Sequence, residues 1–300
     1  MWFRNLRLYR LGKTALPSIS DLENQLARRP LARCGNFEMA SRGWVYPQGE
    51  GSFVHAVGQH WLLALGVEQK LLPATVVRQT AQERAAAIES EQGRKVGRKE
   101  MRDISERVME ELMPKAFSQR RTTWAWIDPG NGWLVVDAGS DARADEFVEV
   151  LLGSVDTLAP RPLQTQISGL SAMTDWLSGG EPPAGFTFDS DLELRSGSEA
   201  QAAIRYVHHD IGGKEVTAHI AAGKLVTKLG MTWNDRISFV LTDKLHIKRL
   251  AFLDILKEQA EQSAELADEQ FDVDFALMTG ELANMFDDLL VALGGEHKPA

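Results

Sequence analysis

The sequence contains one cysteine, Cys34, among 300 residues. A single thiol cannot form an internal disulfide, and its presence suits a reducing compartment. No uncharged apolar run approaches the roughly 20 residues that a membrane-spanning helix needs. The opening segment carries Arg4, Arg7 and Arg10 and leads into no long apolar stretch, which argues against a signal peptide. These absences predict a cytoplasmic protein.

Catalytic and nucleotide-binding motifs are also lacking. There is no GxGxxG after a strand, no GxxxxGK[ST] loop and no HExxH pair, and no Ser/His/Asp set that spacing could support. His208 and His209 lie close to His219 in sequence. Adjacent residues of a strand point to opposite faces, however, so the first two cannot easily share a metal ion. We expect no enzyme, no cofactor and no metal.

Charge is abundant but unevenly distributed. The net charge is −9, yet residues 251–300 hold twelve carboxylates against two lysines, which leaves residues 1–250 at +1. Ten Lys or Arg fall within 84–121, and six within 224–249. Binding follows the local electrostatic field rather than the total charge, so such basic regions can meet a polyanion.

The first basic region is a candidate cationic ridge. On a helix, five cations of 94–102 would share an arc of roughly 140°. These are Arg94, Lys95, Arg98, Lys99 and Arg102. Glu91 and Glu106 fall in the same arc, so an ordinary solvated face is the alternative. Gly97 could also divide the segment into a hairpin of two helices.

The second basic region coincides with predicted strands. It comprises Lys224, Lys228, Arg236, Lys244, Lys248 and Arg249. In a regular strand Lys224 and Lys228 share a face, and basic side chains on a sheet can follow a phosphate backbone. The alternative is an ordinary polar face of a half-covered antiparallel sheet.

Hydrophobic periodicity and turn residues predict an α+β fold with antiparallel sheets. A hairpin over 123–137, turning at Pro129-Gly130-Asn131-Gly132, has the strongest pattern. The other predicted strands are 2–11, 53–57, 61–67, 201–207, 224–231, 236–242 and 245–252. The predicted helices are 19–29, 74–113, 142–152, 214–222, 254–268 and 273–292. Residues 35–51 are expected to form loops.

Three parts are expected from this pattern. Residues 1–73 and 114–177 form a central α+β domain, and 74–113 form a helical projection, the tip. The segment 178–200, with its Gly-Gly-Glu-Pro-Pro run, is the expected boundary to a C-terminal α+β domain, the base, which extends over 178–300.

A series of motifs, in order along nearly the whole chain, resembles the bacterial RdgC family of recombination-associated proteins. The motifs are WFRNL (2–6), YRL (9–11), GWV (43–45), LMPKAFS (112–118), WID (126–128), AGKLVTKL (222–229), KRL (248–250) and FDVDFALMTGEL (271–282). The sequence itself predicts acidic C-terminal helices, and the resemblance implies a ring-shaped homodimer that encircles double-stranded DNA without sequence preference. It also implies a nucleoid-associated protein that limits RecA-mediated recombination, and it brings no catalytic residues.

The DNA-binding residues of such a ring are assigned here from charge. They are Arg94, Lys95, Arg98, Lys99, Arg102, Lys115, Arg120, Arg121, Lys224, Lys228, Lys248 and Arg249. His208 and His209 stand where relatives carry lysine and glutamine near a dimer contact, so we expect a contact that weakens as pH rises through the histidine range. Arg120 and Arg121 replace a second aromatic of relatives, which favours phosphate contact over wedging between bases.

Two other functions compete with this interpretation. The acidic C-terminal helices could make the chain a protein-interaction module that binds a basic partner. A metal-dependent nuclease would need clustered carboxylates, and the only candidates are Asp128 and Asp137, which flank the hairpin.

Overall fold

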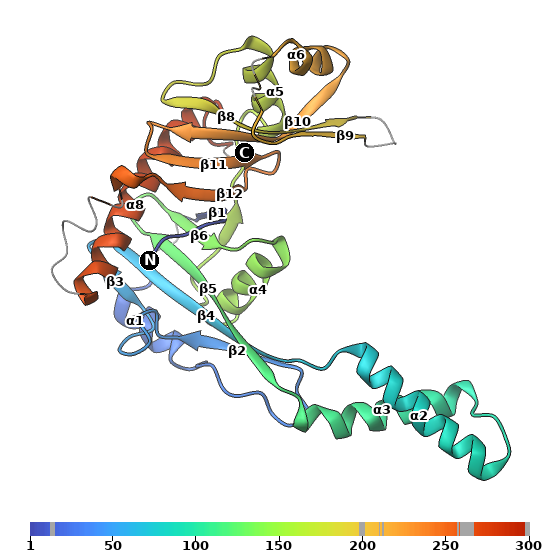
Figure 1. Cartoon of the computed structure of the whole chain (residues 1–300). Coiled ribbons are helices and arrows are strands. Elements are labelled where there is room, and N and C mark those ends of the chain that lie inside the picture. Colours follow the sequence, from blue (N-terminus) through green and yellow to red (C-terminus); the bar gives the residue numbers. More distant parts are fainter. Residues whose placement is uncertain are drawn as a thin grey trace.

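The structure is a computed structural model (Figure 1) that describes residues 1–12, 16–197, 202–209, 211, 213–256, 258 and 267–297. Its strands are β1 Leu6–Leu11, β2 Ala40–Val45, β3 His55–Val57, β4 His60–Lys70, β5 Ser118–Asp128, β6 Trp133–Asp137, β7 Pro160–Pro162, β8 Phe186–Ser196, β9 Ala203–Tyr206, β10 Lys224–Trp233, β11 Ile237–Thr242 and β12 Ile247–Phe252. Its helices are α1 Ile19–Leu26, α2 Ala74–Gln92, α3 Arg98–Leu112, the short 3-10 helix η1 Met113–Lys115, α4 Asp141–Leu152, α5 Gly169–Gly179, α6 Lys214–Ala221 and α8 Ala267–Ala292.

All named strands join one twelve-stranded sheet, and each strand pair is antiparallel. The order along it is β2-β4-β5-β6-β1-β12-β11-β10-β8-β9, with β3 beside β4 and β7 beside β1. Strands β1 and β12 meet through one residue pair, Leu6 and Ile247, so the two halves of the sheet join at a narrow seam. The predicted mixture of helices with antiparallel strands is confirmed, as one continuous sheet.

The N-terminal half of the sheet is covered on both faces. Trp126 and Trp133 pack on Phe286 of α8, with ring centroids 6.1 and 5.3 Å apart. Their neighbours Ile127 and Leu134 belong to a second core with α1 and α4. Because successive strand residues alternate between two buried faces, continuous apolar runs occur in all three central strands, at 61–65 of β4, 124–127 of β5 and 133–136 of β6.

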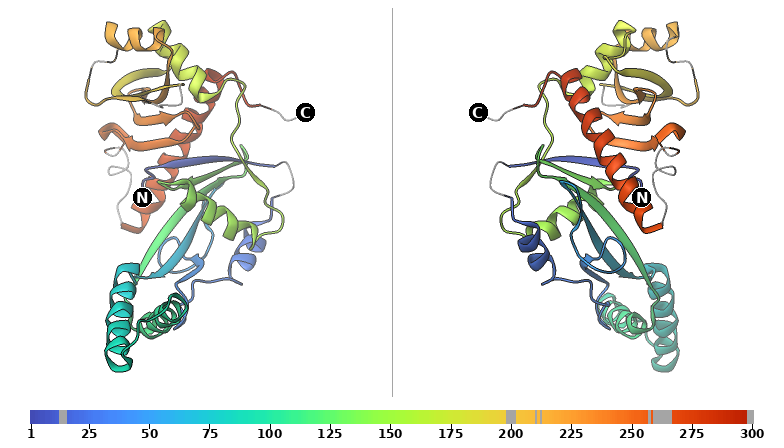
Figure 2. Two further views of the ribbon diagram at one scale, coloured as in Figure 1. Left: turned by 90° about the vertical axis from the view of Figure 1, so that its right-hand side faces the viewer. Right: turned by 90° about the vertical axis from the view of Figure 1, so that its left-hand side faces the viewer.

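The C-terminal half is covered on one face only. Leu192 and Leu194 of β8 join a core with α5, α6 and α8, whereas Glu193 between them faces the other way. We call this other surface of β8–β12 the open face, since no helix of the described ranges covers it (Figure 2). The face is continuous with the side of the sheet on which α4 lies.

The segment 74–113 forms two helices, not one, and they project from the sheet as an arm (Figure 1). Gly93 ends α2 with φ +64°, a conformation that glycine adopts without strain, and Gly97 precedes α3. A small core that includes Ala81, Ile104 and Val108 holds the helices together. The prediction of one continuous ridge over 94–102 is therefore wrong.

Other elements also differ from expectation. The predicted loop 35–51 contains β2, whose Gly43 lies against the backbone at Pro30; a Cβ there would approach the Pro30 carbonyl to 2.5 Å. Strand β8 occupies much of 178–200. The predicted helix 254–268 lies largely outside the described residues. None of the described helices is long and apolar enough to span a bilayer.

Candidate nucleic-acid interface

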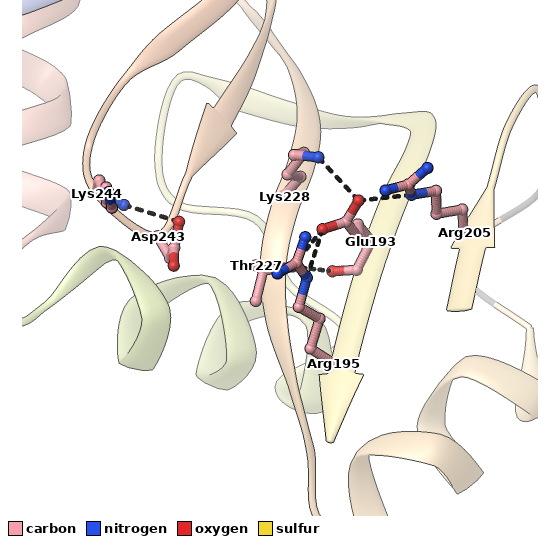
Figure 3. A network of polar contacts seen from close by, with 7 residues as sticks. All are labelled: Glu193, Arg195, Arg205, Thr227, Lys228, Asp243 and Lys244. Atoms are coloured by element: carbon pink, nitrogen blue, oxygen red, sulfur yellow. Dashed lines mark hydrogen bonds and ion pairs between the residues drawn. The ribbon is translucent and has the colours of Figure 1, made fainter. Parts of the chain in front are cut away.

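One buried carboxylate on the open face holds three cations (Figure 3). Glu193 lies opposite Arg205 on β9 and opposite Lys228 on β10, and Arg195 follows two residues later on the same strand. Its Oε2 atom is 2.7 Å from Arg205 Nε and 2.8 Å from Lys228 Nζ, and its Oε1 atom is 2.9 Å from Arg195 Nε. We call these four residues the Glu193 cluster.

The carboxylate of this cluster stays charged at any physiological pH. Burial to 4% side-chain exposure would raise the pKa of Glu193. Hydrogen bonds donated by Lys228, Arg205 and Thr227 outweigh burial and hold that pKa at about 2. With three cations on one carboxylate, the cluster keeps a local excess of positive charge.

A second shared carboxylate lies at the seam. Asp141, the first residue of α4, is 3.0 Å from Arg7 Nε, 3.5 Å from Lys244 Nζ and 3.6 Å from His246 Nδ1. Burial, followed by the neighbouring Arg7 charge, lowers the pKa of His246 to about 4, so this imidazole is neutral near pH 7. These groups line a pocket of about 320 Å³.

Two further carboxylates bind cations on the same side of the sheet. Glu146 of α4 accepts from Arg42 Nε at 2.7 Å and from Arg121 Nη2 at 2.5 Å. Asp191 accepts from Arg249 Nη1 at 2.5 Å. Carboxylates shared between several cations are thus a recurrent feature of this side.

The arm has a different arrangement of charge. Residues 74–113 contain eight Lys or Arg and eight Asp or Glu. The ion pairs within it are one to one: Arg84–Glu111, Arg94–Glu100 and Arg102–Glu106. At its far end, Lys95, Arg98 and Lys99 have no carboxylate partner among the described residues. The last two lie in the first turn of α3, whose positive dipole end adds to their field.

The remaining predicted residues are scattered. A β-bulge between Val226 and Lys228 shifts the face of β10. Lys224 therefore lies 3.2 Å from His219 on the α6 side, and the prediction that it shares a face with Lys228 is wrong. Lys248 lies on the open face opposite Val240.

Near the arm, the predicted residues also separate. Lys115 is exposed at the end of η1. Arg120 pairs with Glu68, on the opposite side of the sheet from Arg121. The twelve predicted residues thus form no single patch. They lie on the arm, at the junction of the arm with the sheet, and on the C-terminal half of the sheet.

Sequence reasoning missed Arg195 and Arg205. Arg195 alternates along β8 with buried Leu192 and Leu194, and Arg205 alternates along β9 with Ile204 and Tyr206, which pack against the same core. That the two arginines meet becomes visible only when the pairing of β8 with β9 is known. His208 and His209 are exposed at the end of β9, the edge strand of the sheet. The ring of His209 packs against Tyr206 with centroids 5.2 Å apart.

The two carboxylates considered for a nuclease do not converge. Asp128 accepts from Asn131 N at 3.1 Å in the hairpin turn and is 2% exposed. Asp137, at the other end of the hairpin, accepts from Asn5 N at 2.8 Å. Within the described ranges, no three His, Cys, Asp or Glu residues stand close enough to hold a metal ion.

The fold and its charges define a class: a protein with one large antiparallel sheet, a projecting helical arm and a cation-rich open face. Residues 1–296 match a family model described as "Putative exonuclease, RdgC". The chain is 53% identical over 299 residues to the recombination-associated protein RdgC of Dechloromonas aromatica, covering 99% of this chain and 98% of that one. It is 51% identical to the protein of the same name from Cupriavidus pinatubonensis, covering 99% and 100%. The chain belongs to the RdgC family of recombination-associated proteins.

Proposed function

We propose that this protein binds double-stranded DNA without sequence preference and does not cleave it. The observation that carries the proposal is the Glu193 cluster, which presents three cations around one buried carboxylate on the open face. Lysine and arginine contacts with phosphates supply affinity without reading bases. Lys95, Arg98 and Lys99 at the far end of the arm offer a second set of such contacts.

A ring-shaped homodimer would place these cations around the duplex. In Figure 1 the arm and the β9 end of the sheet extend to the same side, and the chain has the outline of an open C. Helices α5 and α6 lie above β8 and β10, so the open face turns toward the arm. Two such chains would close a ring by contacts at both ends, one of them at His208 and His209 on the edge strand β9.

Occupation of DNA by such a ring would limit RecA-mediated recombination, because the recombinase filament needs the same DNA. The printed names of the relatives, recombination-associated proteins, support a role of this kind. The protein would then be cytoplasmic and associated with the nucleoid.

The competing interaction module receives less support. Carboxylates of α8 already have partners within the chain: Asp272 with His55, Glu281 with Arg236, and Asp288 with the Trp233 indole. These contacts fix the helix to the sheet, so the same groups are not free for a basic protein partner.

The ring is tested by comparing a closed circular duplex with the same duplex made linear. After binding at low salt and a challenge at high salt, a ring remains on the circle and slides off free ends. We expect retention on the circle and its recovery on linear DNA with blocked ends. Equal loss from both forms would contradict encirclement.

Incubation of DNA with the protein and Mg²⁺ tests the absence of cleavage, since shortened DNA would identify a nuclease.

A further inference from the structure

The guanidinium groups of Arg195 and Arg205 are bound to the rest of the described chain on one side only. Each uses Nε to reach Glu193, at 2.9 and 2.7 Å respectively. For the Nη atoms of both, no acceptor occurs in the described part of the chain. The side chains remain 43% and 66% exposed, so the unused edges meet solvent.

The two groups are neighbours because one carboxylate binds both. Arg205 of β9 lies directly opposite Glu193 of β8. Arg195 of β8 lies opposite the small Ala203 and is therefore diagonal to Arg205. Figure 3 shows them reaching the carboxylate from different sides, with Lys228 as the third cation. A guanidinium anchored through Nε presents its outer edge as a preset donor pair, the arrangement that suits bidentate binding of a phosphate.

We infer that Arg195 and Arg205 form a clamp for a phosphodiester group, with Glu193 as the residue that positions them. The inference rests on the proposed function and refines it, because it replaces a diffuse basic lining with a defined phosphate site. The low pKa of Glu193, about 2, keeps the anchor ionised near neutral pH. The clamp would still ignore base sequence, since every nucleotide carries the same phosphate.

The test keeps charge constant while changing geometry. In an Arg195→Lys/Arg205→Lys double variant the field is retained, but the fork of donors is lost. We expect duplex affinity to fall about tenfold, with the slope of log K against log salt unchanged. The matched control is Arg84→Lys on the arm, whose Nη1 and Nη2 atoms are both already bound to Glu111; it should stay within about twofold. An unchanged double variant would overturn the clamp.

The Glu193→Gln variant separates the clamp from a simple charge effect, because the two predict changes of opposite sign in DNA affinity. A simple field model predicts tighter DNA binding, because a negative charge is removed; the clamp predicts weaker binding, because both guanidiniums lose their anchor. Tighter binding by the folded variant would contradict the clamp. Circular dichroism checks folding, and the lysine variant remains informative if this one does not fold.

Failure of the clamp can be separated from failure of the proposed function. If wild-type protein binds duplex DNA and the lysine double variant binds equally well, only the clamp fails. If wild-type protein binds no duplex, inorganic tripolyphosphate becomes the probe. If tripolyphosphate raises the Tm of the wild-type protein but not that of the lysine double variant, the two arginines form a phosphate clamp although the protein does not bind DNA. No rise would reject both.

Discussion

The arm carries eight cations and the Glu193 cluster three, and the two regions pair them differently. On the arm, exposed cations pair one to one, as in Arg102–Glu106, whose side chains are 80% and 59% exposed. In the cluster, one buried carboxylate serves three cations. Solvent screens the first kind of pair, whereas the second keeps a local positive excess and a fixed geometry. The number of cations that share each carboxylate, more than the total number of cations, decides where a polyanion can bind.

The largest expected effect concerns the unpaired far end of the arm. An Arg98→Glu/Lys99→Glu variant should weaken binding to any duplex by at least about tenfold at moderate salt and flatten the salt dependence, because two phosphate contacts become repulsive. The control exchanges a pair in place, Arg84→Glu with Glu111→Arg, and should bind like wild type. Fluorescence anisotropy with two unrelated duplexes measures both. If only one duplex were affected, non-specific binding would be contradicted.

The comparison can be sharpened through stability. Glu193→Gln leaves three cations around a neutral amide and should lower the free energy of unfolding by about 1–3 kcal/mol. Glu106→Gln on the arm should produce no measurable change. Urea denaturation at pH 7 compares the two variants, and equal losses would show that burial does not distinguish these sites.

The same network has a defined pH window. The pKa of Glu193 is lowered in the folded state from 4.5 to about 2. Its contribution is therefore complete above about pH 4.5 and is lost as pH falls toward 2. We expect the stability gap between wild type and Glu193→Gln to be constant from pH 5 to 8 and to narrow below pH 4.5. A gap that changes between pH 5 and 8 would contradict the assignment.

Much of this architecture is predictable from the sequence, because local patterns determine it. The hairpin of β5 and β6, helix α4 and strands β10–β12 lie where alternation, apolar spacing and turn residues place them. The bulge in β10 is not visible in this way, since Lys224 and Lys228 keep a regular spacing in sequence. The Glu193 cluster depends on the register of three strands, which no local pattern encodes.

The seam provides a smaller effect of pH on stability, which comes from a histidine rather than from a carboxylate. Burial lowers the pKa of His246 from 6.5 to about 4, so the unfolded chain takes up a proton in this range before the folded chain does. Stability is therefore full above pH 6.5 and falls as pH drops from 6.5 to 4. His246→Asn should remove about 1–2 kcal/mol of this decline. Thermal unfolding at pH 7.5 and 4.5 tests it; an unchanged difference would contradict the prediction.

The smallest expected effect lies at the edge strand. If His208 and His209 contact a partner in their protonated form, the dimer should dissociate a few-fold more readily at pH 8 than at pH 5.5. A double variant with asparagine at both positions should lose this dependence. Sedimentation equilibrium measures the constants, and a flat profile in the wild-type protein would exclude the contact.

The most direct test of DNA binding through phosphates is a salt titration with two unrelated labelled duplexes. Fluorescence anisotropy at several salt concentrations gives the affinity of each. We expect equal affinities and a steep linear fall of log K with log salt, with a slope of about −0.9 for each phosphate contacted. A large difference between the two duplexes, or no binding at low salt, would contradict the account.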